Sequence, residues 1–441
     1  MQKDVHLVLS GRWLISMDDA RQEQQTEEGV SIAIAGDTIA EIGHSLACKY
    51  PDAQHLHCPH GLIMPGLINT HTHAAMSCFR GLADDLQLMT WLTQHIFPRE
   101  AQLTKEMVYH ATLLSICEMI KSGTTSFNDM YLFEQEVAAA AATAKMRAWV
   151  GEGFFDFPSP NYGQLEKGVE YVEELFAKYA HHDLVTITVT PHAVYTCNPA
   201  LLQRAHALAD QQKSLYHIHL AETKEEVKTC RERYGCTPVQ HLENLGLLHE
   251  RVVAAHCVIL EEEDRDLLAK RRVKITHCPE SNMKLASGIA PVQQLLNQGI
   301  TVGLGTDGSA SNNDVDMFGE MSTAAKLHKV RDLDPTAMSA ATVLHAATLG
   351  GAKVLGRETQ LGSLAVGKKA DLIVLDMNQP HLTPLYNPVS HLVYAAKGSD
   401  VLHSVINGRL VMCNRQLTTL DETAVLAEMG KISKRVQQMA G

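Results

Sequence analysis

Residues 67–73, LINTHTH, determine how the rest of the chain is interpreted. Their apolar and β-branched residues predict a strand, and alternate side chains of a strand share one face. His71 and His73 would then point the same way and could bind one metal ion together. A polar turn after a buried run is the alternative, because a single His-x-His pair is weak evidence. The choice depends on what the rest of the chain brings to this pair.

Seven further segments have the same β-like character and alternate with stretches of helical periodicity. With the opening stretch included, the predicted strands are 66–73, 124–130, 147–155, 184–196, 215–223, 251–258, 273–282 and 300–308. The predicted helices include 105–122, 165–179, 199–212 and 225–234. This alternation is typical of the α/β class and predicts a (β/α)8 TIM-like barrel. A doubly wound sheet is the rival, but the glycine-rich first turn that it needs is missing.

Both ends of the chain have a different pattern, with short β-like runs separated by turn residues. VHLVLSGRWLISM (5–17) lies before the barrel region, and GSLAVGKKADLIVLDM (362–377) and VLHSVINGRLVM (401–412) lie after it. Two β-rich ends that flank a barrel can join in one small sheet. We therefore predict a small β domain built from 1–62 and 359–441 around a catalytic barrel of 63–358.

Composition excludes several functional classes. The formal net charge of the 441 residues is −12, and lysine and arginine are scattered, so a nucleic acid polymer is not expected as a partner. No apolar run reaches the roughly 18 residues of a membrane span, and the N-terminus does not resemble a signal peptide. The ten cysteines form no CxxC pair, which fits a reducing compartment. We expect a cytoplasmic protein without a membrane partner.

Polar side chains collect at the predicted strand ends, where a barrel places its catalytic groups. These residues are His71, His73, His192, His217, His219, Glu222, His256, His277 and Asp307. Three imidazoles and one carboxylate would suit Zn²⁺ or Fe²⁺. We predict the ligands His71, His73, His219 and Asp307. His219 is preferred to His217 because it lies nearer the strand end and three residues before Glu222.

The remaining groups at these strand ends suit hydrolysis. A bound divalent ion lowers the pKa of water from about 15.7 towards 7. We expect Asp307 to accept a proton from that water, His256 to orient it, and Glu222 to carry a proton to the substrate. A metal-binding protein without catalysis is the alternative from another class. Glu222 argues against it, because a structural site needs no free acid.

Six motifs together resemble the amidohydrolase superfamily and, within it, the 5-methylthioadenosine/S-adenosylhomocysteine deaminases. They are PGLINTHTH, HIHLAET, AAHCV, SNMKLASGIAPV, LGTDGSASNN and GSLAVGKKADLIVLD. The resemblance covers nearly the whole chain. It implies a barrel with a composite β-sandwich domain, one divalent metal ion per subunit, a homo-oligomer, and release of ammonia from a 6-aminopurine nucleoside. No lysine stands at the end of the fourth strand to bridge two metals, where the sequence offers His192 instead.

The resemblance also implies substrate contacts. WLTQHIFPRE (91–100) is similar to the substrate loop of the family, in which Trp91 would contact the nucleoside and Glu100 would accept hydrogen bonds from the ribose. His192 and Glu222 would face the substrate as well. Core packing for Trp91 and a solvated helix end for Glu100 are the alternatives that the residues alone would favour.

The expected substrates are 5′-methylthioadenosine and adenosine, with S-adenosylhomocysteine as a third candidate. Relatives that take S-adenosylhomocysteine use arginines after the third strand, where this chain has Glu152 and Gln164, so we predict that the first two are preferred. Arg80 or a residue of a neighbouring subunit could still supply a cation for the amino-acid carboxylate of S-adenosylhomocysteine. Guanine, a pterin or a triazine remains the alternative substrate class, against which Glu100 argues because it suits a ribose.

Overall fold

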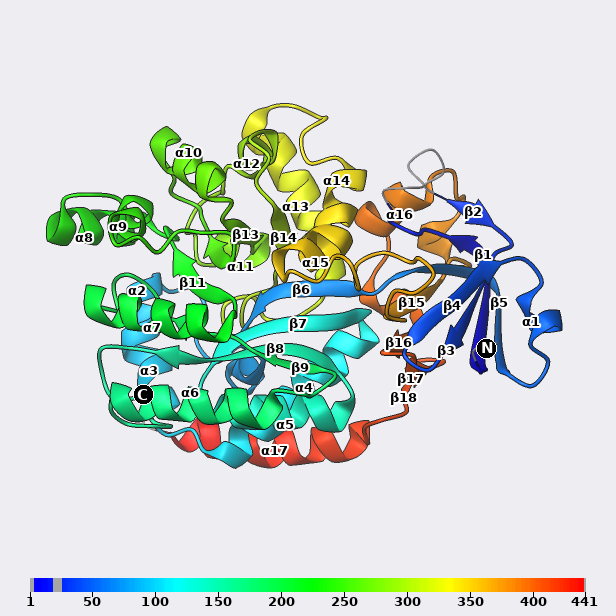
Figure 1. Ribbon diagram of the computed structural model, residues 1–441, viewed down its shortest axis with the longest axis horizontal. Coiled ribbons are helices and arrows are strands. Elements are labelled where there is room, and N and C mark those ends of the chain that lie inside the picture. Colours follow the sequence, from blue (N-terminus) through cyan, green and yellow to red (C-terminus); the bar gives the residue numbers. More distant parts are fainter. Residues whose placement is uncertain (1–3, 19–25, 440–441) are drawn as a thin grey trace.

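Two parallel sheets and one mixed sheet organise the protein in the computed structural model, which describes residues 4–18 and 26–439 (Figure 1). One parallel sheet has the order β10-β8-β7-β6 with β9 beside β8, and the other has the order β11-β12-β13-β14. Their strands are β6 Leu67–Thr72, β7 Thr124–Tyr131, β8 Arg147–Phe154, β9 Val185–Ile187, β10 Thr190–Pro191, β11 Tyr216–Leu220, β12 Val252–His256, β13 Lys274–His277 and β14 Val302–Leu304. The predicted α/β class is confirmed, and each strand lies within one residue of a predicted range.

Contacts at both edges connect the two parallel sheets. Ala193, just after β10, forms a parallel bridge with His219 of β11. At the opposite edge the backbone N–H of Asp307 donates to the carbonyl oxygen of His71 at 3.0 Å. Gly305 permits this approach, because a Cβ there would lie 2.8 Å from the backbone nitrogen and oxygen of His71. The carboxyl ends of β6 and β11 and the segment after β14 are thereby brought to the same end of the sheets.

Helices alternate with these strands and cover them (Figure 1). They are α4 Lys105–Lys121, α5 Glu134–Ala144, α6 Leu165–Tyr179, α7 Pro199–Gln212, α8 Lys224–Tyr234, α9 Pro238–Asn244, α10 Glu262–Arg271, α11 Pro279–Lys284, α12 Val292–Asn297, α13 Met317–Asp332, α14 Ala340–His345 and α15 Gly351–Val354. Local sequence sets their starts: the side chain of Asn198 caps α7 and is followed by Pro199, and Thr223 caps α8. The four helices predicted from periodicity are confirmed to within one residue.

A nine-stranded mixed sheet combines strands from both ends of the chain. They are β1 Val5–Leu14, β2 Glu27–Glu28, β3 Ser31–Ala35, β4 Thr38–Gly43, β5 Gln54–Pro65, β15 Leu372–Asp376, β16 Val401–Ile406, β17 Arg409–Cys413 and β18 Gln416–Leu417. β5 pairs with β1 in parallel and with β15 in antiparallel orientation, so the N-terminal and C-terminal strands are direct neighbours. In Figure 1 the blue and orange strands of this sheet lie together at one side of the molecule.

The last helix returns to the parallel sheets. α17 (Glu422–Gln438) packs against α4, as the red and cyan helices in Figure 1 illustrate. Two ion pairs join them: Lys121 contacts Glu422 at 2.7 Å, and Arg435 contacts Glu106 at 2.8 Å. The C-terminal segment therefore contributes to two parts of the fold and not only to the mixed sheet.

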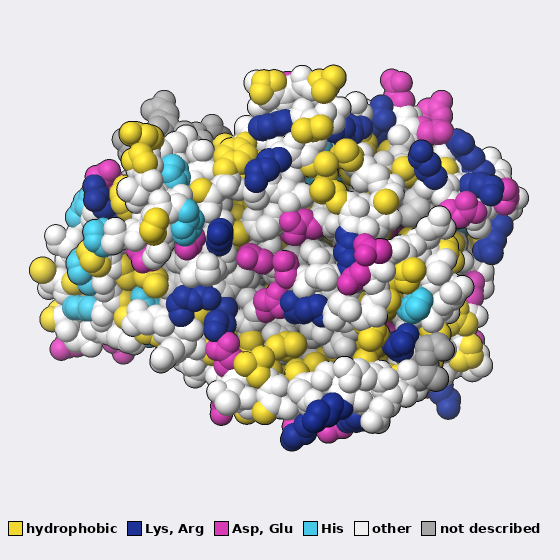
Figure 2. All heavy atoms as spheres, turned by 180° about the vertical axis from the view of Figure 1, so that it is seen from behind, with side chains coloured by type: hydrophobic (Ala, Val, Ile, Leu, Met, Phe, Trp, Pro, Cys, Tyr) yellow, Lys and Arg dark blue, Asp and Glu magenta, His cyan; other side chains and the backbone are white. Residues whose placement is uncertain are grey.

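The distribution of charge on the surface and the character of the helices can be seen directly in the structure. On the face in Figure 2, lysine and arginine side chains are interspersed with acidic ones and form no continuous basic stripe. Among the described residues, no helix combines the length and the apolar character that a membrane crossing requires.

A buried ion pair connects the first parallel sheet to the mixed sheet, and its loss should destabilise the protein. Arg147 of β8 donates to both carboxylate oxygens of Asp371, at 2.7 and 3.1 Å, with the side chains 8% and 4% exposed. Arg147→Met would leave a buried unpaired carboxylate, so we expect the free energy of unfolding to fall by about 3–5 kcal/mol.

Urea denaturation followed by circular dichroism measures this loss. The matched control is Arg231→Met, which removes an exposed pair with Glu261 and should cost less than about 1 kcal/mol. Equal losses in the two variants would contradict a special role for the buried pair.

Candidate metal centre and active site

Three histidines at the ends of β6 and β11 are each held through the Nδ1 atom. His73 Nδ1 bonds the carbonyl oxygen of Met130, and His219 Nδ1 donates to that of His192 at 2.9 Å. His71 Nδ1 lies 3.1 Å from His217 Nε2. Anchoring one ring nitrogen fixes the plane of the imidazole and leaves the other nitrogen available to bind a metal ion. In all three rings this available nitrogen is Nε2.

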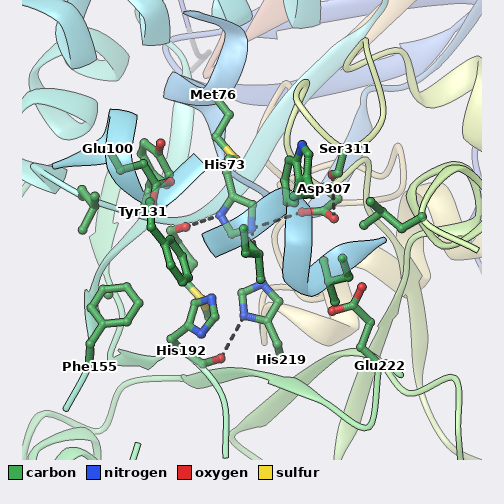
Figure 3. Close-up of a pocket in the computed structure, with 18 of the residues that line it drawn as sticks. His73, Met76, Glu100, Tyr131, Phe155, His192, His219, Glu222, Asp307 and Ser311 are labelled. Carbon is green, nitrogen blue, oxygen red and sulfur yellow. Dashed lines mark hydrogen bonds and ion pairs between the residues drawn. The ribbon is translucent and has the colours of Figure 1, made fainter. Parts of the chain in front are cut away.

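These Nε2 atoms converge on Asp307, which follows β14. Asp307 Oδ1 lies 3.4 Å from Nε2 of His71 and 3.1 Å from Nε2 of His73. Nε2 of His219 is 3.3 Å from that of His73, and Figure 3 shows His73, His219 and Asp307 side by side. All four ligand atoms lie within 4.8 Å of one another. Nε2 of the buried His71 has no hydrogen-bond partner among the described residues, which a core histidine would avoid. Three nitrogen donors and one oxygen donor fit a divalent metal ion.

Asp307 is fixed as the anionic member of this group. Its Oδ2 accepts hydrogen bonds from Ser281 Oγ at 2.6 Å and Ser311 Oγ at 2.9 Å. Burial would raise the pKa of Asp307, but the neighbouring imidazoles of His71 and His73 hold it well below its usual range. The ionised carboxylate is the form that binds a cation. The backbone φ of Asp307 is +60°, which turns the chain at the strand ends.

Glu222 and His256 lie on the same rim, close to the four-residue group. Glu222 accepts a hydrogen bond from Ser287 Oγ at 3.1 Å, and burial raises its pKa. His256 Nδ1 donates to Asn282 Oδ1 at 2.9 Å, so its buried Nε2 is left unpaired. A buried carboxyl group with a raised pKa is suited to proton transfer, and a fixed imidazole can orient a small reactant.

One pocket collects the predicted site residues. Its lining includes His73, Trp91, Glu100, His192, His219, Glu222, His256 and Asp307, whereas His71 is fully buried behind it. Trp91 begins the π-helical turn η3 (Trp91–Ile96), and Glu100 ends α3 (Phe97–Glu100). Glu100 is half-buried in the pocket wall and is not a solvated helix end, and burial raises its pKa to about 7. Figure 3 places Glu100 and Glu222 on opposite sides of the histidines.

Several residues of the site were not predicted from the sequence. His217 anchors His71, Asn282 anchors His256, and Ser281 and Ser311 hold Asp307. The pocket wall also contains Met76, Leu88, Leu92, Phe97, Met130, Tyr131, Leu132, Gly153, Phe155, Tyr195 and Leu285. Of these residues, only His217 could be suspected from the sequence, because it shares a strand face with His219 and was the alternative ligand.

The interpretation of Glu152 as a neighbour of the substrate was wrong. Its carboxylate accepts hydrogen bonds from the backbone N–H groups of Phe133 and Glu134, at 3.3 and 2.8 Å, and it is buried at the start of α5. Strand alternation explains this, since Gly153 and not Glu152 faces the pocket. Gln164 only precedes α6 and is absent from the lining.

Comparison with known proteins places this geometry in a family. A profile of the amidohydrolase family matches residues 62–411. The chain belongs to the amidohydrolase family. This amidohydrolase is 54% identical, over 92% of its length and 93% of the relative, to a 5-methylthioadenosine/S-adenosylhomocysteine deaminase of Syntrophobacter fumaroxidans. It is 44% identical, over 98% of each chain, to a 5′-deoxyadenosine deaminase of Methanosarcina barkeri.

A solved structure is also similar over the whole length. An adenosine deaminase from Xanthomonas campestris, solved with bound zinc, aligns with a TM-score of 0.95 and 36% identity, covering 99% of this amidohydrolase and 100% of that chain. The sequence-based assignment to this family is therefore confirmed.

The contact between His217 and His71 leads to a prediction about metal affinity. His217→Leu removes the partner of His71 Nδ1, so the ring can turn and we expect zinc affinity to fall about 10–100-fold. Competition with a chromophoric chelator measures it, and circular dichroism reports the fold. The control His57→Gln alters an exposed histidine of β5 outside this group. Unchanged affinity in a folded His217→Leu variant would show that His71 needs no anchor.

Proposed function

We propose that this amidohydrolase is a metal-dependent hydrolytic deaminase of 6-aminopurine nucleosides, giving the inosine analogue and ammonia. The observation that carries the proposal is a set of three imidazoles and Asp307 that shares one pocket with the free acid Glu222. The names of the relatives, which refer to 5-methylthioadenosine, S-adenosylhomocysteine and 5′-deoxyadenosine, support this substrate class.

We infer one divalent metal ion per subunit, held by His71, His73, His219 and Asp307. Zinc is our first choice, supported by the zinc in the similar adenosine deaminase, and iron is the alternative. When bound, such an ion polarises water and lowers its pKa towards neutrality.

Two residues of the chain carry the proton transfers in this proposal, and a third orients the water. Asp307 accepts a proton from the attacking water, and His256, fixed by Asn282, orients that water through its free Nε2. Glu222 delivers a proton to the purine ring as the water oxygen bonds to C6. The amine takes the proton held by Asp307 and leaves as ammonia when the C6–N bond breaks, and the proton of the new C6 hydroxyl returns to Glu222, which leaves the 6-oxo purine nucleoside.

Trp91, Glu100 and His192 are the substrate-binding residues in this proposal. The indole of Trp91 is 5% exposed and lines the pocket, so it can pack against the nucleoside. Glu100 can accept hydrogen bonds from two ribose hydroxyls in its ionised form. His192 lies beside His219, with ring centroids 4.8 Å apart, and faces the purine side of the pocket.

The proposal extends to the closure of the barrel and to the composition of the small β domain. We infer that the two parallel sheets form one (β/α)8 barrel of residues 63–358. Residues 1–62 and 359–441 would form the small β-sandwich domain, with α17 returning to the barrel. A homo-oligomer in the cytoplasm is our expectation for the assembled enzyme.

Steady-state release of ammonia from a substrate panel tests the reaction class. With zinc-reconstituted protein, we expect turnover of 5′-methylthioadenosine and adenosine at kcat/KM within the enzyme range of about 10⁴–10⁸ M⁻¹s⁻¹. Guanine, a pterin and an aminated triazine serve as the free-ring comparison. Faster turnover of any of these rings than of every nucleoside would refute the nucleoside assignment.

Glu222→Gln tests the proton transfer. Glutamine keeps the size of the side chain but cannot carry the proton, so we expect kcat to fall about 10²–10⁴-fold while one zinc per chain is retained. Metal analysis and ammonia release are measured on the same sample. The control Glu225→Gln changes an exposed neighbour in α8 and should keep wild-type kcat. Full turnover by Glu222→Gln would eliminate Glu222 as the proton carrier.

A further inference from the structure

A row of aromatic rings extends from the metal centre to the mouth of the pocket. The rings of His192 and Phe155 have centroids 5.1 Å apart, and Phe155 stacks on Phe157 at 4.9 Å. Phe157 in turn contacts Phe97 at 5.9 Å. Phe157 is 42% exposed, so the row reaches solvent at this ring. We call Phe155, Phe157 and Phe97 the aromatic row.

The aromatic row is tied to the active site at its inner end. His192 accepts the hydrogen bond from His219 Nδ1, and both His192 and Phe155 line the pocket (Figure 3). Gly153 makes room for the row, because a Cβ at that position would lie 3.0 Å from the ring of Phe155. The position of Phe155 therefore depends on a residue without a side chain, as well as on its stacking with Phe157.

The outer end of the row lies beside the residue proposed to bind the ribose. Phe97 and Glu100 lie one helical turn apart in α3 and both line the pocket. If the purine faces the metal centre and the ribose hydroxyls face Glu100, the 5′ group extends from the ribose away from C6. Figure 3 places Phe155 on the same side of the histidines as Glu100 and away from Glu222, so the aromatic row offers an apolar surface on the ribose side of the pocket.

No cation is available in this pocket for an amino-acid carboxylate. Among the described residues that line it, none is a lysine or an arginine. Arg80, which the sequence left as a candidate, is bound to Glu118 and to the carbonyl oxygen of Asn313. A charged 5′ group would lose hydration without gaining an ion pair, whereas a thioether or methyl group packs well on aromatic rings.

We propose that the aromatic row is the subsite for the 5′-substituent of the nucleoside, and that it selects an uncharged apolar group such as methylthio over the zwitterionic amino-acid chain of S-adenosylhomocysteine. The inference rests on the proposed nucleoside deaminase function. Phe97 and Phe155 line the pocket and Phe157 stacks on Phe155, whereas the carboxylate of Glu152 faces away from the pocket.

Substitutions of Phe157 test the subsite on adenosine, 5′-deoxyadenosine, 5′-methylthioadenosine and S-adenosylhomocysteine. Phe157→Ala should lower kcat/KM for 5′-methylthioadenosine about tenfold and change that for adenosine less than about threefold. Phe157→Leu keeps an apolar surface and should retain most of the preference. Phe157→Arg supplies a cation at the same place and should raise kcat/KM for S-adenosylhomocysteine about tenfold. The control Tyr386→Ala removes an aromatic ring that is 88% exposed outside the pocket and should change no ratio.

The panel separates failure of the subsite from failure of the function. If wild-type protein deaminates the nucleosides but Phe157→Ala and Phe157→Arg leave all ratios of kcat/KM unchanged, the subsite is refuted and the proposed function stands. Wild-type preference for S-adenosylhomocysteine would also refute the subsite. If no nucleoside is deaminated, the proposed function itself is refuted, and the subsite with it.

Discussion

The Nδ1 anchors of three imidazole rings are the constraint on which the active site depends. A free imidazole can turn about its side-chain bonds, but His71, His73 and His219 are each held through Nδ1 by a group from another part of the fold. Their Nε2 atoms can then meet only at one place, opposite Asp307. This preorganisation removes most of the conformational cost of assembling a four-ligand site.

The sheets supply the anchors because parallel strands end together. The carbonyl groups of Met130 and His192 come from β7 and from the segment after β10, each beside the strand that carries the bound histidine. Gly305 allows Asp307 to approach His71 across the opposite edge. A displacement of any one strand would therefore misplace a ligand, which links the packing of the whole sheet region to the chemistry of its rim.

Sequence reasoning predicted much of this site because its strongest signals are local. Alternation along one strand aligned His71 with His73, and the strand-end position of Asp307 predicted that its carboxylate lies beside these rings, as it does in the structure. The hydrogen-bonding partners Asn282 and Ser281 could not be found this way, because they contact residues 26 positions away along the chain. Glu152 was misassigned because its place after the third predicted strand does not say which way its side chain points. Alternate residues of β8 face opposite sides, and Gly153 is the one that faces the pocket.

The central claim is that one metal ion is held by these four side chains. Anomalous diffraction at the zinc edge, from crystals of the zinc-reconstituted protein, tests it most directly. The account predicts a single peak bonded to Nε2 of His71, His73 and His219 and to the carboxylate of Asp307, at about 2.0–2.2 Å from each ligand atom. Two peaks in the pocket, or one peak bonded to Glu222 in place of any of these ligands, would contradict it.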